Sequence, residues 1–557
     1  MYNILLGGAA GQGVDTTTAI LEKLLKRAGY HVLTVRDFMS RIRGGHNFSL
    51  LRFGAEAVYS HDKFVNAIVA LNEETYYLHE GELLPGGFVL CDSALAIDDP
   101  RAVKLDMGQM AKALGNPRVA GTIAIGAVLK MFGEGLDGAK DVLPDFVKEQ
   151  YLEINLKALK EGYDAVEARY PHLSGGAAAD ELLISGSKAV SLGALAAGLN
   201  FYSAYPMSPA TPILESLAGA AEKAGIVVEQ AEDEIAAINM AIGASYAGAR
   251  AMTGTSGGGF SLMVEALGLA GIAEIPVVIV NVQRPGPATG LPTRTEQSDL
   301  LFTISASQAE FPRLVLAPKN PEDAFYQTMR AFDLAERYQI PALILSDQYL
   351  GDASYTVPVP DPRKFAIAKP ASAHEGPEEY LRYRFTESGV SPRLLPGFTG
   401  HLVDADSDEH DERGAITESA EMRTRMMDKR MKKLEGLAKE LQEPEFAGAE
   451  DFDALLIGWG STWGPIREAV NLLNERGGKK YAALIFSDIY PLPTNLLTEK
   501  AKAAKEIINV EQNATGQLAK LIRMETGIRM SGSVLKYDGR QISGREICES
   551  LEKEDAK

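Results

Sequence analysis

The sequence is poor in cysteine: its 557 residues include only Cys91 and Cys548. A structural zinc site or an iron–sulfur cluster usually takes four ligands, most of them cysteine thiolates, so two cysteines cannot supply a cluster. Two cysteines also exclude a disulfide framework. Because low cysteine use is typical of a reducing compartment, we expect a cytoplasmic protein.

Basic residues and long apolar runs are also scarce. The chain has 56 Lys and Arg against 75 Asp and Glu, which gives a formal net charge of −19. Proteins that bind nucleic acid or anionic membranes usually carry a basic excess, so we expect neither partner. No window approaches 18 uninterrupted apolar residues, which predicts no transmembrane helix, and residues 1–13 lack the basic region of a signal peptide.

What the chain does contain is a regular alternation of short apolar runs and amphipathic stretches. Its length suggests three or four domains, and the alternation predicts α/β domains built on parallel sheets. A helix is predicted over 213–223, where apolar residues recur at helical spacing. The predicted strands are 3–6, 32–35, 67–71, 87–90, 182–184, 226–229, 249–253, 277–282, 314–316, 342–345, 454–458, 483–486 and 507–510.

Changes in composition divide the chain. Residues 174–179 (SGGAAA) are small, and residues 366–448 are rich in Pro, Gly and charge, with a Met- and Lys-rich helix predicted at 418–443. We interpret the acidic segment 408–412 (DEHDE) as a solvated surface rather than a metal site, and predict no metal ligands in this chain. The predicted domains are 1–173, 180–365, a mixed charged connector at 366–450, and 451–557.

A first glycine-rich loop, residues 7–15 (GGAAGQGVD), joins a predicted strand to a helix. It lacks the G-x-G-x-x-G spacing of dinucleotide sites, and Val14 stands where a P-loop needs Lys. Backbone N–H groups around Gly8, Gly11 and Gly13 can still hold a phosphate at a helix N-terminus. A tight turn without a ligand explains the glycines equally well, so both interpretations stay open.

A second glycine-rich loop, residues 253–260 (TGTSGGGF), contains the G-x-S-x-G pattern of α/β-hydrolases, with Ser256 as nucleophile. A serine hydrolase also needs an acid and a histidine downstream. The later histidines all lie in the charged connector, which disfavours that alternative. Gly257 and Gly258 are better explained by backbone that lies close to a planar ligand.

Several motifs, taken together and in order, resemble one family. The chain resembles the 2-oxoacid:ferredoxin oxidoreductases, most closely the α subunit of the 2-oxoglutarate type, in which a γ-like domain is fused ahead of the α portion. The resemblance implies a γ-like domain at 1–173, a thiamine diphosphate pyrimidine-binding domain at 180–365 and a transketolase C-terminal-like domain at 451–557. The motifs are 41–47 (RIRGGHN), 205–209 (YPMSP), 231–248, 283–300, 458–464 (GWGSTWG) and 510–518 (VEQNATGQL).

The resemblance implies a thiamine diphosphate enzyme in which Glu234 is the catalytic residue. Glu234 matches the family's glutamate that shares a proton with the pyrimidine ring of the cofactor and so activates its thiazolium carbon; the cofactor carries the decarboxylation chemistry. Gly257 and Gly258 are the other expected cofactor contacts. From the residues alone, Asp233 and Glu234 can equally be a helix cap that complements the helix dipole.

The substrate contacts follow from the same resemblance. A 2-oxoacid presents a carboxylate, and Arg284, directly after a predicted strand, can donate two parallel hydrogen bonds to it. The resemblance pairs Arg284 with Thr293 and places Tyr205 and Ser208 at the substrate, although Ser208 stands where the family has threonine. Asn47, after His46 in the γ-like domain, is a further candidate contact.

Two expected elements are missing. The chain has no GDG motif for a magnesium–diphosphate site and no four-cysteine cluster. The resemblance implies that a separate β subunit supplies both Mg²⁺ and a [4Fe–4S] cluster, that this chain alone is inactive, and that the assembly is a dimer of α–β heterodimers. The γ-like domain is associated with coenzyme A, whose phosphates suit Gly8, Gly11 and Gly13.

The predicted activity is therefore the reversible, coenzyme A-dependent oxidative decarboxylation of 2-oxoglutarate to succinyl-CoA and carbon dioxide, with electrons passed to ferredoxin. The reverse direction would fix carbon dioxide. Pyruvate, a branched 2-oxoacid and indolepyruvate remain alternative substrates; Arg43 and Arg294 are available for a distal carboxylate. A non-catalytic assembly protein and a serine hydrolase using Ser256 are the alternatives from other classes.

Overall fold

The computed structural model describes residues 1–38, 45–365, 367 and 379–555. The chain divides into two compact units. The first is residues 1–184 with 352–359, and the second is residues 185–351 with 360–557. Within the described ranges, no helix is both long and apolar enough to cross a membrane.

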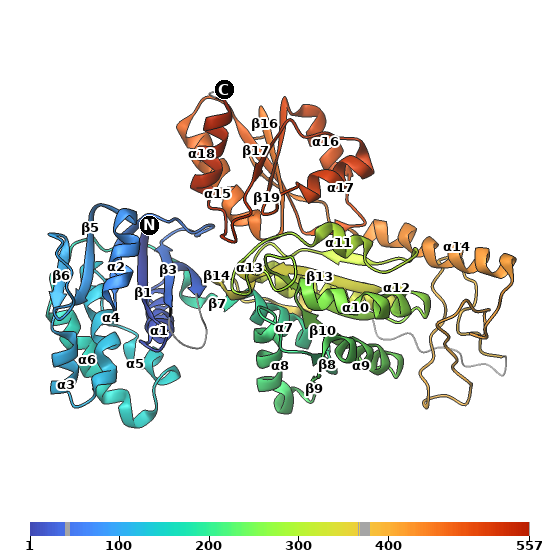
Figure 1. Ribbon diagram of the computed structural model, residues 1–557, viewed down its shortest axis with the longest axis horizontal. Coiled ribbons are helices and arrows are strands. Elements are labelled where there is room, and N and C mark those ends of the chain that lie inside the picture. Colours follow the sequence, from blue (N-terminus) through green and yellow to red (C-terminus); the bar gives the residue numbers. More distant parts are fainter. Residues whose placement is uncertain (39–44, 366, 368–378, 556–557) are drawn as a thin grey trace. The chain divides into compact units, whose positions relative to one another are not determined.

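The first unit is built on a mixed sheet with strand order β6-β5-β4-β1-β3-β2-β14-β7 (Figure 1). Strands β1, β4, β5 and β6 are parallel, whereas β3 is antiparallel to both β1 and β2, and β14 is antiparallel to β2. The prediction of a parallel sheet therefore holds for only part of it. The strands are β1 (Tyr2–Ala9), β2 (His31–Phe38), β3 (His46–Gly54), β4 (Val65–Ala70), β5 (Leu83–Asp92), β6 (Ala102–Leu105), β7 (Leu182–Ser185) and β14 (Ser354–Val357).

Helices cover this sheet and complete its core. The helix α4 (Ala120–Met131) is almost entirely apolar and packs against α6 (Leu152–Asp164) and α1 (Val14–Arg27). Its apolar side chains join those of the sheet in one buried cluster. Its low polarity explains why it forms, because a helix that is apolar on all sides is stable only where it is buried.

The second unit contains a central sheet with strand order β18-β12-β13-β11-β10-β8-β9. Apart from the antiparallel β18, its strands run parallel. Numbered along the chain from β8, the order is 2-1-3-4-6-5, a doubly wound arrangement. The strands are β8 (Phe201–Ala204), β9 (Val227–Gln230), β10 (Ala251–Thr255), β11 (Val277–Gln283), β12 (Leu314–Leu316), β13 (Pro341–Asp347) and β18 (Asp488–Tyr490).

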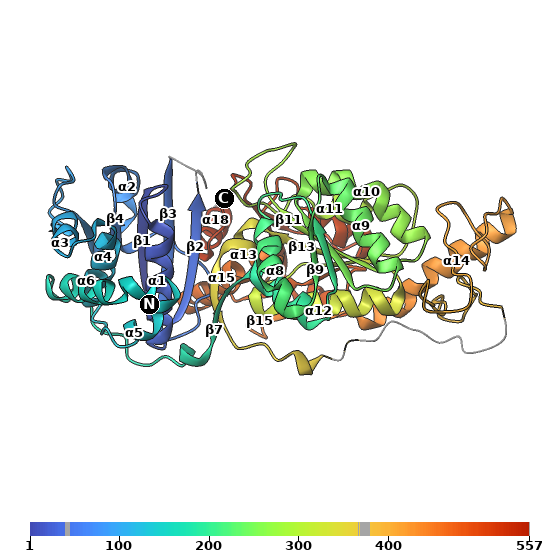
Figure 2. The same ribbon diagram turned by 90° about the horizontal axis from the view of Figure 1, so that it is seen from below.

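The helices around the central sheet follow the α/β pattern. Figure 2 shows α9 and α10 side by side along the sheet, and the two helices are in contact. The prediction of a helix over 213–223 is confirmed by α8. The helices are α7 (Gly186–Ala196), α8 (Thr211–Ala224), α9 (Glu234–Tyr246), α10 (Gly257–Ile272), α11 (Leu300–Ser305), α12 (Pro321–Tyr338) and α13 (Gln348–Asp352).

The C-terminal part of the second unit has its own sheet, with strand order β15-β17-β16-β19-β20, in which β15 alone of these strands is antiparallel. Its apolar side chains merge with the central sheet's core, and β18 joins the central sheet directly. The elements are β15 (Glu445–Gly448), β16 (Ala454–Trp459), α15 (Trp463–Arg476), β17 (Tyr481–Phe486), α16 (Asn495–Ala503), β19 (Glu506–Glu511), α17 (Gln517–Thr526), β20 (Gly532–Leu535) and α18 (Gly544–Asp555).

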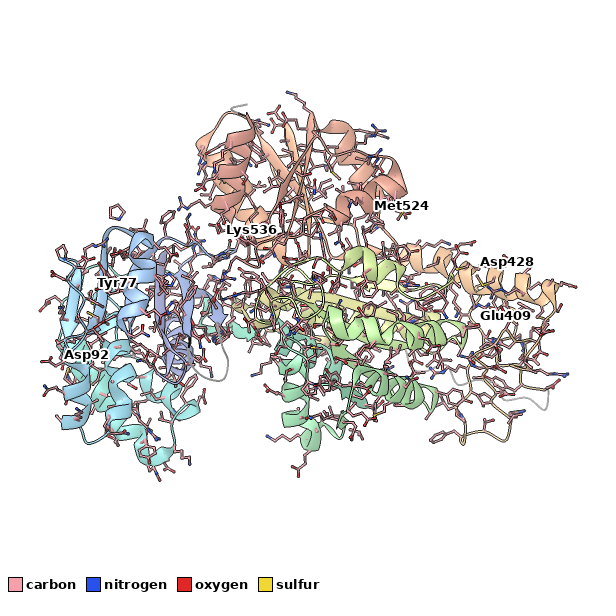
Figure 3. The ribbon with its side chains drawn as sticks, viewed as in Figure 1. Tyr77, Asp92, Glu409, Asp428, Met524 and Lys536 are labelled. Atoms are coloured by element: carbon pink, nitrogen blue, oxygen red, sulfur yellow. The ribbon has the colours of Figure 1, made fainter. Side chains whose placement is uncertain are left out.

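The connector contains the predicted helix, α14 (Ala420–Leu437), and corrects one interpretation. Glu409, in the loop beside α14 (Figure 3), pairs with Arg423 and Arg430. His410 is fully buried, and its ring lies 4.0 Å from that of Tyr383. The prediction of a solvated surface at 408–412 was wrong for these two residues, because arginines from α14 neutralise the acidic side chain and fold the segment inward.

Candidate active site

The strand order of the central sheet creates a crevice at its carboxyl edge. The chain leaves β8 toward β9 on one side and leaves β10 toward β11 on the other, and ligands of doubly wound sheets bind where this reversal occurs. The segments after β8, β10 and β11 carry Ser208, Gly257 and Arg284 in that order. The fold therefore gathers most of the predicted cofactor and substrate residues at one edge.

Glu234 is the first residue of α9, and its neighbour performs the capping. The Asp233 side chain accepts a hydrogen bond from Ala236 N at 2.8 Å, as an N-cap residue does. Glu234 is only 3% exposed, and its Oε1 has no hydrogen-bond partner among the described residues. An unpaired buried carboxylate oxygen is costly, so the helix cap explains Asp233 and leaves Glu234 available for a ligand.

Gly259, in the first turn of α10, is the glycine that lies against Glu234. A Cβ atom on Gly259 would come within 2.3 Å of Glu234 Oε1 and 2.1 Å of Thr255 Oγ1. A side chain there would fill the space beside the carboxylate. Sequence reasoning selected Gly257 and Gly258 instead and missed Gly259.

Gly257 and Gly258 have different surroundings. A Cβ atom on Gly257 would meet Asp299 Oδ2 at 2.4 Å, whereas one on Gly258 would lie 3.7 Å from the nearest atom, Ala288 O. Burial raises the pKa of Asp299, and a hydrogen bond from Asn281 Nδ2 at 3.1 Å opposes that shift. The assignment of Gly257 and Gly258 as cofactor contacts stays a prediction.

Arg284 is brought to the same crevice. Its Nη1 donates a hydrogen bond of 2.7 Å to Ser208 O, so the predicted substrate residues after β8 and β11 are in contact. Burial lowers the pKa of Arg284, and the negative charge of Glu234 opposes that shift, which places the two charges within electrostatic reach. Within the described ranges no other hydrogen bond of the Arg284 guanidinium is found, and a buried guanidinium with N–H groups left over suits a carboxylate.

The other predicted substrate residues of this unit are Tyr205 and Thr293. Tyr205 is 39% exposed, directly after β8. Thr293 is half-buried on a turn in which Leu291 N donates to Pro285 O at 3.1 Å. Their contact with substrate stays a prediction, and Arg43 lies outside the described residues.

In the first unit, the glycine-rich loop is a tight turn. Strand β1 extends to Ala9, so the prediction that ended this strand at residue 6 was too short. Gly11 and Gly13 have φ values of +95° and +84°, which favour glycine whether or not a ligand binds. The Gln12 side chain accepts a hydrogen bond from Ala9 N at 2.7 Å and closes the turn.

Asn47 pairs with Gly8 across β3 and β1 and is buried. Beside it, His46 Nε2 lies 2.9 Å from His79 Nε2, and His79 Nδ1 lies 2.7 Å from Glu82. Burial and the neighbouring His79 lower the pKa of His46. The anion-binding loop and the role of Asn47 stay predictions.

The hydrolase alternative finds no support in the geometry. Ser256 is fully buried, and its Oγ has no hydrogen-bond partner among the described residues, so no described histidine activates it. Its φ of −122° and ψ of 179° are extended rather than strained, unlike the nucleophile of an α/β-hydrolase.

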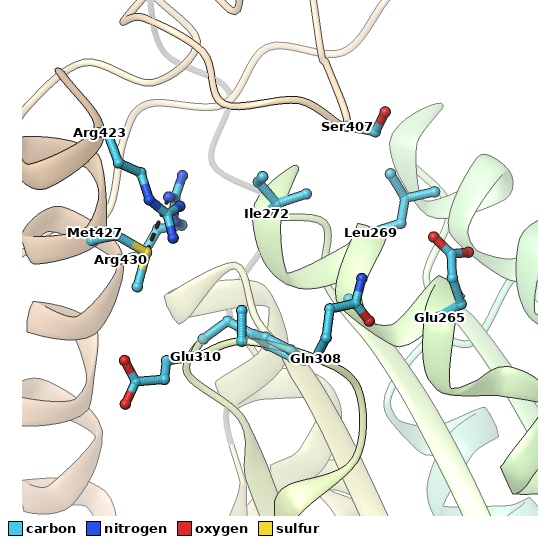
Figure 4. A pocket seen from close by; sticks show the side chains of 12 residues that line it. Glu265, Leu269, Ile272, Gln308, Glu310, Ser407, Arg423, Met427 and Arg430 are labelled. Atoms are coloured by element: carbon cyan, nitrogen blue, oxygen red, sulfur yellow. Dashed lines mark hydrogen bonds between the residues drawn. The ribbon is translucent and has the colours of Figure 1, made fainter. Parts of the chain in front are cut away.

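A separate pocket lies between α10 and α14 and includes Leu269, Arg423 and Arg430 (Figure 4). It contains none of the predicted site residues. Among the described residues, no cluster of three or more His, Cys, Asp or Glu side chains could hold a metal ion.

Two parts of the chain match known protein families. Residues 192–429 match the family described as pyruvate flavodoxin/ferredoxin oxidoreductase, thiamine diphosphate-binding, and residues 3–165 match pyruvate ferredoxin/flavodoxin oxidoreductase. Together with the crevice, these matches define the class: an oxidoreductase subunit with a thiamine diphosphate-binding α/β domain.

Similar proteins specify the family. The chain is 33% identical to the α subunit of a 2-oxoacid:ferredoxin oxidoreductase from Sulfolobus sp, over 98% of this chain and 96% of that one. It is also 32% identical to 2-oxoglutarate oxidoreductase subunit KorA from Mycobacterium tuberculosis, over 93% of this chain and 81% of that one. This chain belongs to the 2-oxoacid:ferredoxin oxidoreductase family, as an α subunit with a fused γ-like domain, and is thus part of an enzyme.

A solved structure has the same fold as this chain over almost its whole length. The 2-oxoglutarate:ferredoxin oxidoreductase from Magnetococcus marinus, with 2-oxoglutarate, coenzyme A and succinyl-CoA bound, has a TM-score of 0.93 and 32% identity over 99% of each chain. The predicted family and α/β fold class are confirmed, and the hydrolase and non-catalytic alternatives are left without support.

Proposed function

We propose that this chain is the fused γ–α subunit of an enzyme that oxidatively decarboxylates 2-oxoglutarate to succinyl-CoA, reversibly and with electrons passed to ferredoxin. The observation that carries the proposal is the buried, unpaired Oε1 of Glu234 beside Gly259, at the crevice of a thiamine diphosphate-binding domain. The M. marinus relative, which holds 2-oxoglutarate and both coenzyme A species, supports the substrate.

The residues present fit the aminopyrimidine end of thiamine diphosphate. Glu234 Oε1 is an acceptor that lacks a donor, and the missing side chain at Gly259 leaves space beside it. When bound, the cofactor would supply a nucleophilic carbon for the 2-oxo group and an electron sink for the bonding electrons as carbon dioxide leaves. Glu234 holds or donates the proton at the ring nitrogen, and its burial keeps water from competing for that proton.

Arg284 binds and orients the 2-oxoacid carboxylate in this proposal. Its Nη1 is held by Ser208 O, which fixes the guanidinium plane and leaves the remaining N–H groups for substrate. Tyr205, Ser208 and Thr293 complete the substrate side of this crevice. Pyruvate, a branched 2-oxoacid and indolepyruvate are the competing substrates.

The remaining parts of the proposal concern partners. A β subunit supplies Mg²⁺, the diphosphate contacts and a [4Fe–4S] cluster, the α–β heterodimers pair, and the assembly works in the cytoplasm. Gly8, Gly11 and Gly13 contact coenzyme A. The domains are the γ-like part at 1–173, the pyrimidine-binding part at 180–365, the connector at 366–450 and the transketolase C-terminal-like part at 451–557.

Carbon dioxide release from a panel of 2-oxoacids tests the proposal, with the chain co-expressed with its β subunit. We expect 2-oxoglutarate to give the highest kcat/KM and the chain alone to give none. Preference for pyruvate would overturn the substrate but not the family. Turnover by the chain alone would contradict the requirement for a β subunit.

A further inference from the structure

Gln297 connects the substrate loop, residues 284–299, to the C-terminal part of the chain. It lies between Arg284 and α11 and is completely buried. Its backbone N donates to Gln512 O at 2.7 Å, and its side-chain Nε2 donates to Trp459 O at 2.8 Å. Its Oε1 accepts from Gln512 N at 3.3 Å, and its backbone O accepts from Asn513 Nδ2 at 3.1 Å. Each backbone and side-chain polar group of Gln297 is thus bonded to the C-terminal part of the chain, at the ends of β16 and β19.

Adjacent residues strengthen this connection. Gln517 Nε2 donates to Ser298 O at 2.7 Å, and its Oε1 accepts from Leu301 N at 2.9 Å. On the other side of Gln297, Thr295 N donates to Gly539 O at 3.3 Å. The second half of the loop is therefore held by the C-terminal part of the chain along its length. It is also bonded to the central sheet at two points, because Thr295 Oγ1 donates to Asp347 Oδ1 and Asp299 N donates to Gln283 Oε1.

The residues that hold Gln297 are themselves fixed. The buried Glu511 carboxylate accepts hydrogen bonds from Trp459 Nε1 at 3.2 Å, Asn513 Nδ2 at 2.9 Å and Leu518 N at 2.9 Å. Asn513 Oδ1 accepts from Gly516 N at 2.8 Å. A fully satisfied buried polar network of this kind specifies one arrangement, so Trp459, Gln512 and Asn513 offer a rigid surface to the loop.

The first half of the loop is held differently. Between Arg284 and Gly290, the hydrogen bonds found among the described residues are the one from Arg284 to Ser208 O and the one from Leu291 N to Pro285 O, which closes a turn. The path of this half and the position of Thr293 therefore depend on where the second half of the loop is anchored.

We propose that Gln297 is a positioning residue through which the C-terminal part of the chain fixes the loop carrying Arg284 and Thr293, so that this part takes part in binding the 2-oxoacid. The inference rests on the proposed function of those two residues. It assigns the C-terminal part a role in substrate recognition, because a reactant held about 1 Å from its productive position can lose roughly 100-fold in rate.

Gln327 provides a matched control. It lies on α12, is as buried as Gln297, and also bonds to residues from the C-terminal part of the chain, Ser487 and Asp488. Its Nε2 donates to Ser487 Oγ at 2.5 Å and to Asp488 Oδ1 at 3.1 Å, and its Oε1 accepts from Arg330 at 2.6 Å. None of these partners belongs to the substrate loop.

The test compares Gln297→Leu with Gln327→Leu in the co-expressed complex. We expect Gln297→Leu to raise KM for the preferred 2-oxoacid at least about tenfold with a smaller change in kcat, and Gln327→Leu to leave KM within about twofold at an equal loss of thermal stability. If Gln297→Leu does not fold, Gln297→Asn, too short to reach Trp459 O, replaces it. An unchanged KM, or an equal rise in both variants, would overturn the inference.

Hydrogen–deuterium exchange of the full chain separates this inference from the proposed function. Peptides covering 284–299 should exchange faster in Gln297→Leu than in the wild type or Gln327→Leu, whatever the substrate is. Unchanged exchange would overturn the inference even in an active complex. Faster exchange in a complex inactive on every 2-oxoacid would retain the anchor and reject the proposed function.

Discussion

Two buried glutamates in the second unit make an instructive pair. Glu234 follows β9 at the carboxyl edge of the central sheet, and its Oε1 has no partner among the described residues. Glu274 precedes β11 at the opposite edge, and Lys429 and Lys433 from α14 both pair with its carboxylate. The same residue type is thus left unpaired at one edge and saturated at the other.

The pKa of Glu274 shows the effect of its three cationic neighbours. Burial alone would raise the pKa of Glu274, but the two lysines and Arg382 hold it well below its usual range. The structure therefore keeps Glu274 charged in order to attach the connector helix. A carboxylate without such partners keeps its acceptor for a ligand, which is how we interpret Glu234.

The largest predicted effect is on stability, at the saturated site. Glu274→Gln leaves two buried lysines and Arg382 without their counter-charge, and breaking a buried ion pair typically costs about 3–5 kcal/mol. Urea unfolding of the full chain measures this loss. A cost below about 1 kcal/mol would show that the two glutamates do not differ as described.

The next effect is on activity, at the unpaired site. Gly259→Ala places a methyl group against Glu234 Oε1 and Thr255 Oγ1 and should lower kcat/KM about 100-fold. Gly243→Ala, on α9, is the matched control, since a Cβ there would meet no described atom within 4 Å outside its own turn of the helix. Equal losses in the two variants would mean that the space beside Glu234 has no special role.

A smaller effect is expected from Arg284→Lys. Lysine keeps the charge but cannot donate two parallel hydrogen bonds to one carboxylate while also bonding to Ser208 O. We expect KM for the 2-oxoacid to rise about tenfold, with kcat less affected, in steady-state assays of the complex. An unchanged KM would remove Arg284 from the substrate site.

A further effect is a pH dependence of the free energy of unfolding at the saturated site. Burial lowers the pKa of Lys433 to about 7, against 10.5 in the unfolded chain. Between these values the unfolded chain binds more protons, so the contribution of Lys433 to the free energy of unfolding rises with pH from about 7 to 10.5. Urea unfolding from pH 6.5 to 9.5 should show a rise that Lys433→Met reduces; identical slopes would contradict it.

The contrast also explains what the sequence could reveal. Local patterns predicted the strands before Glu234 and Arg284, because an apolar run followed by a helix start is visible within about ten residues. The strand β3 was missed, since HNFSLLRFG follows a glycine motif that resembles a loop and gains its partners from β1 and β2. Strand β8, only four residues long, was missed as well.

The site was predicted in part for a related reason. Residues 257, 258 and 259 are all glycine, so the sequence alone does not distinguish them. The turn of α10 decides which one faces Glu234. Gln297 gave no signal, because its partners Gln512 and Asn513 are more than 200 residues away along the chain. Contacts of this range come from the tertiary fold, which local patterning does not encode.

The central claim is that Glu234 keeps an unpaired carboxylate oxygen for the cofactor's proton. Oxoacid-dependent dye reduction by the complex, at saturating thiamine diphosphate, tests it directly in Glu234→Gln beside Asp233→Asn. We expect Glu234→Gln to lose at least about 100-fold in kcat while its unfolding midpoint stays close to that of the wild type, and Asp233→Asn to retain most activity. Full turnover by Glu234→Gln would contradict the account.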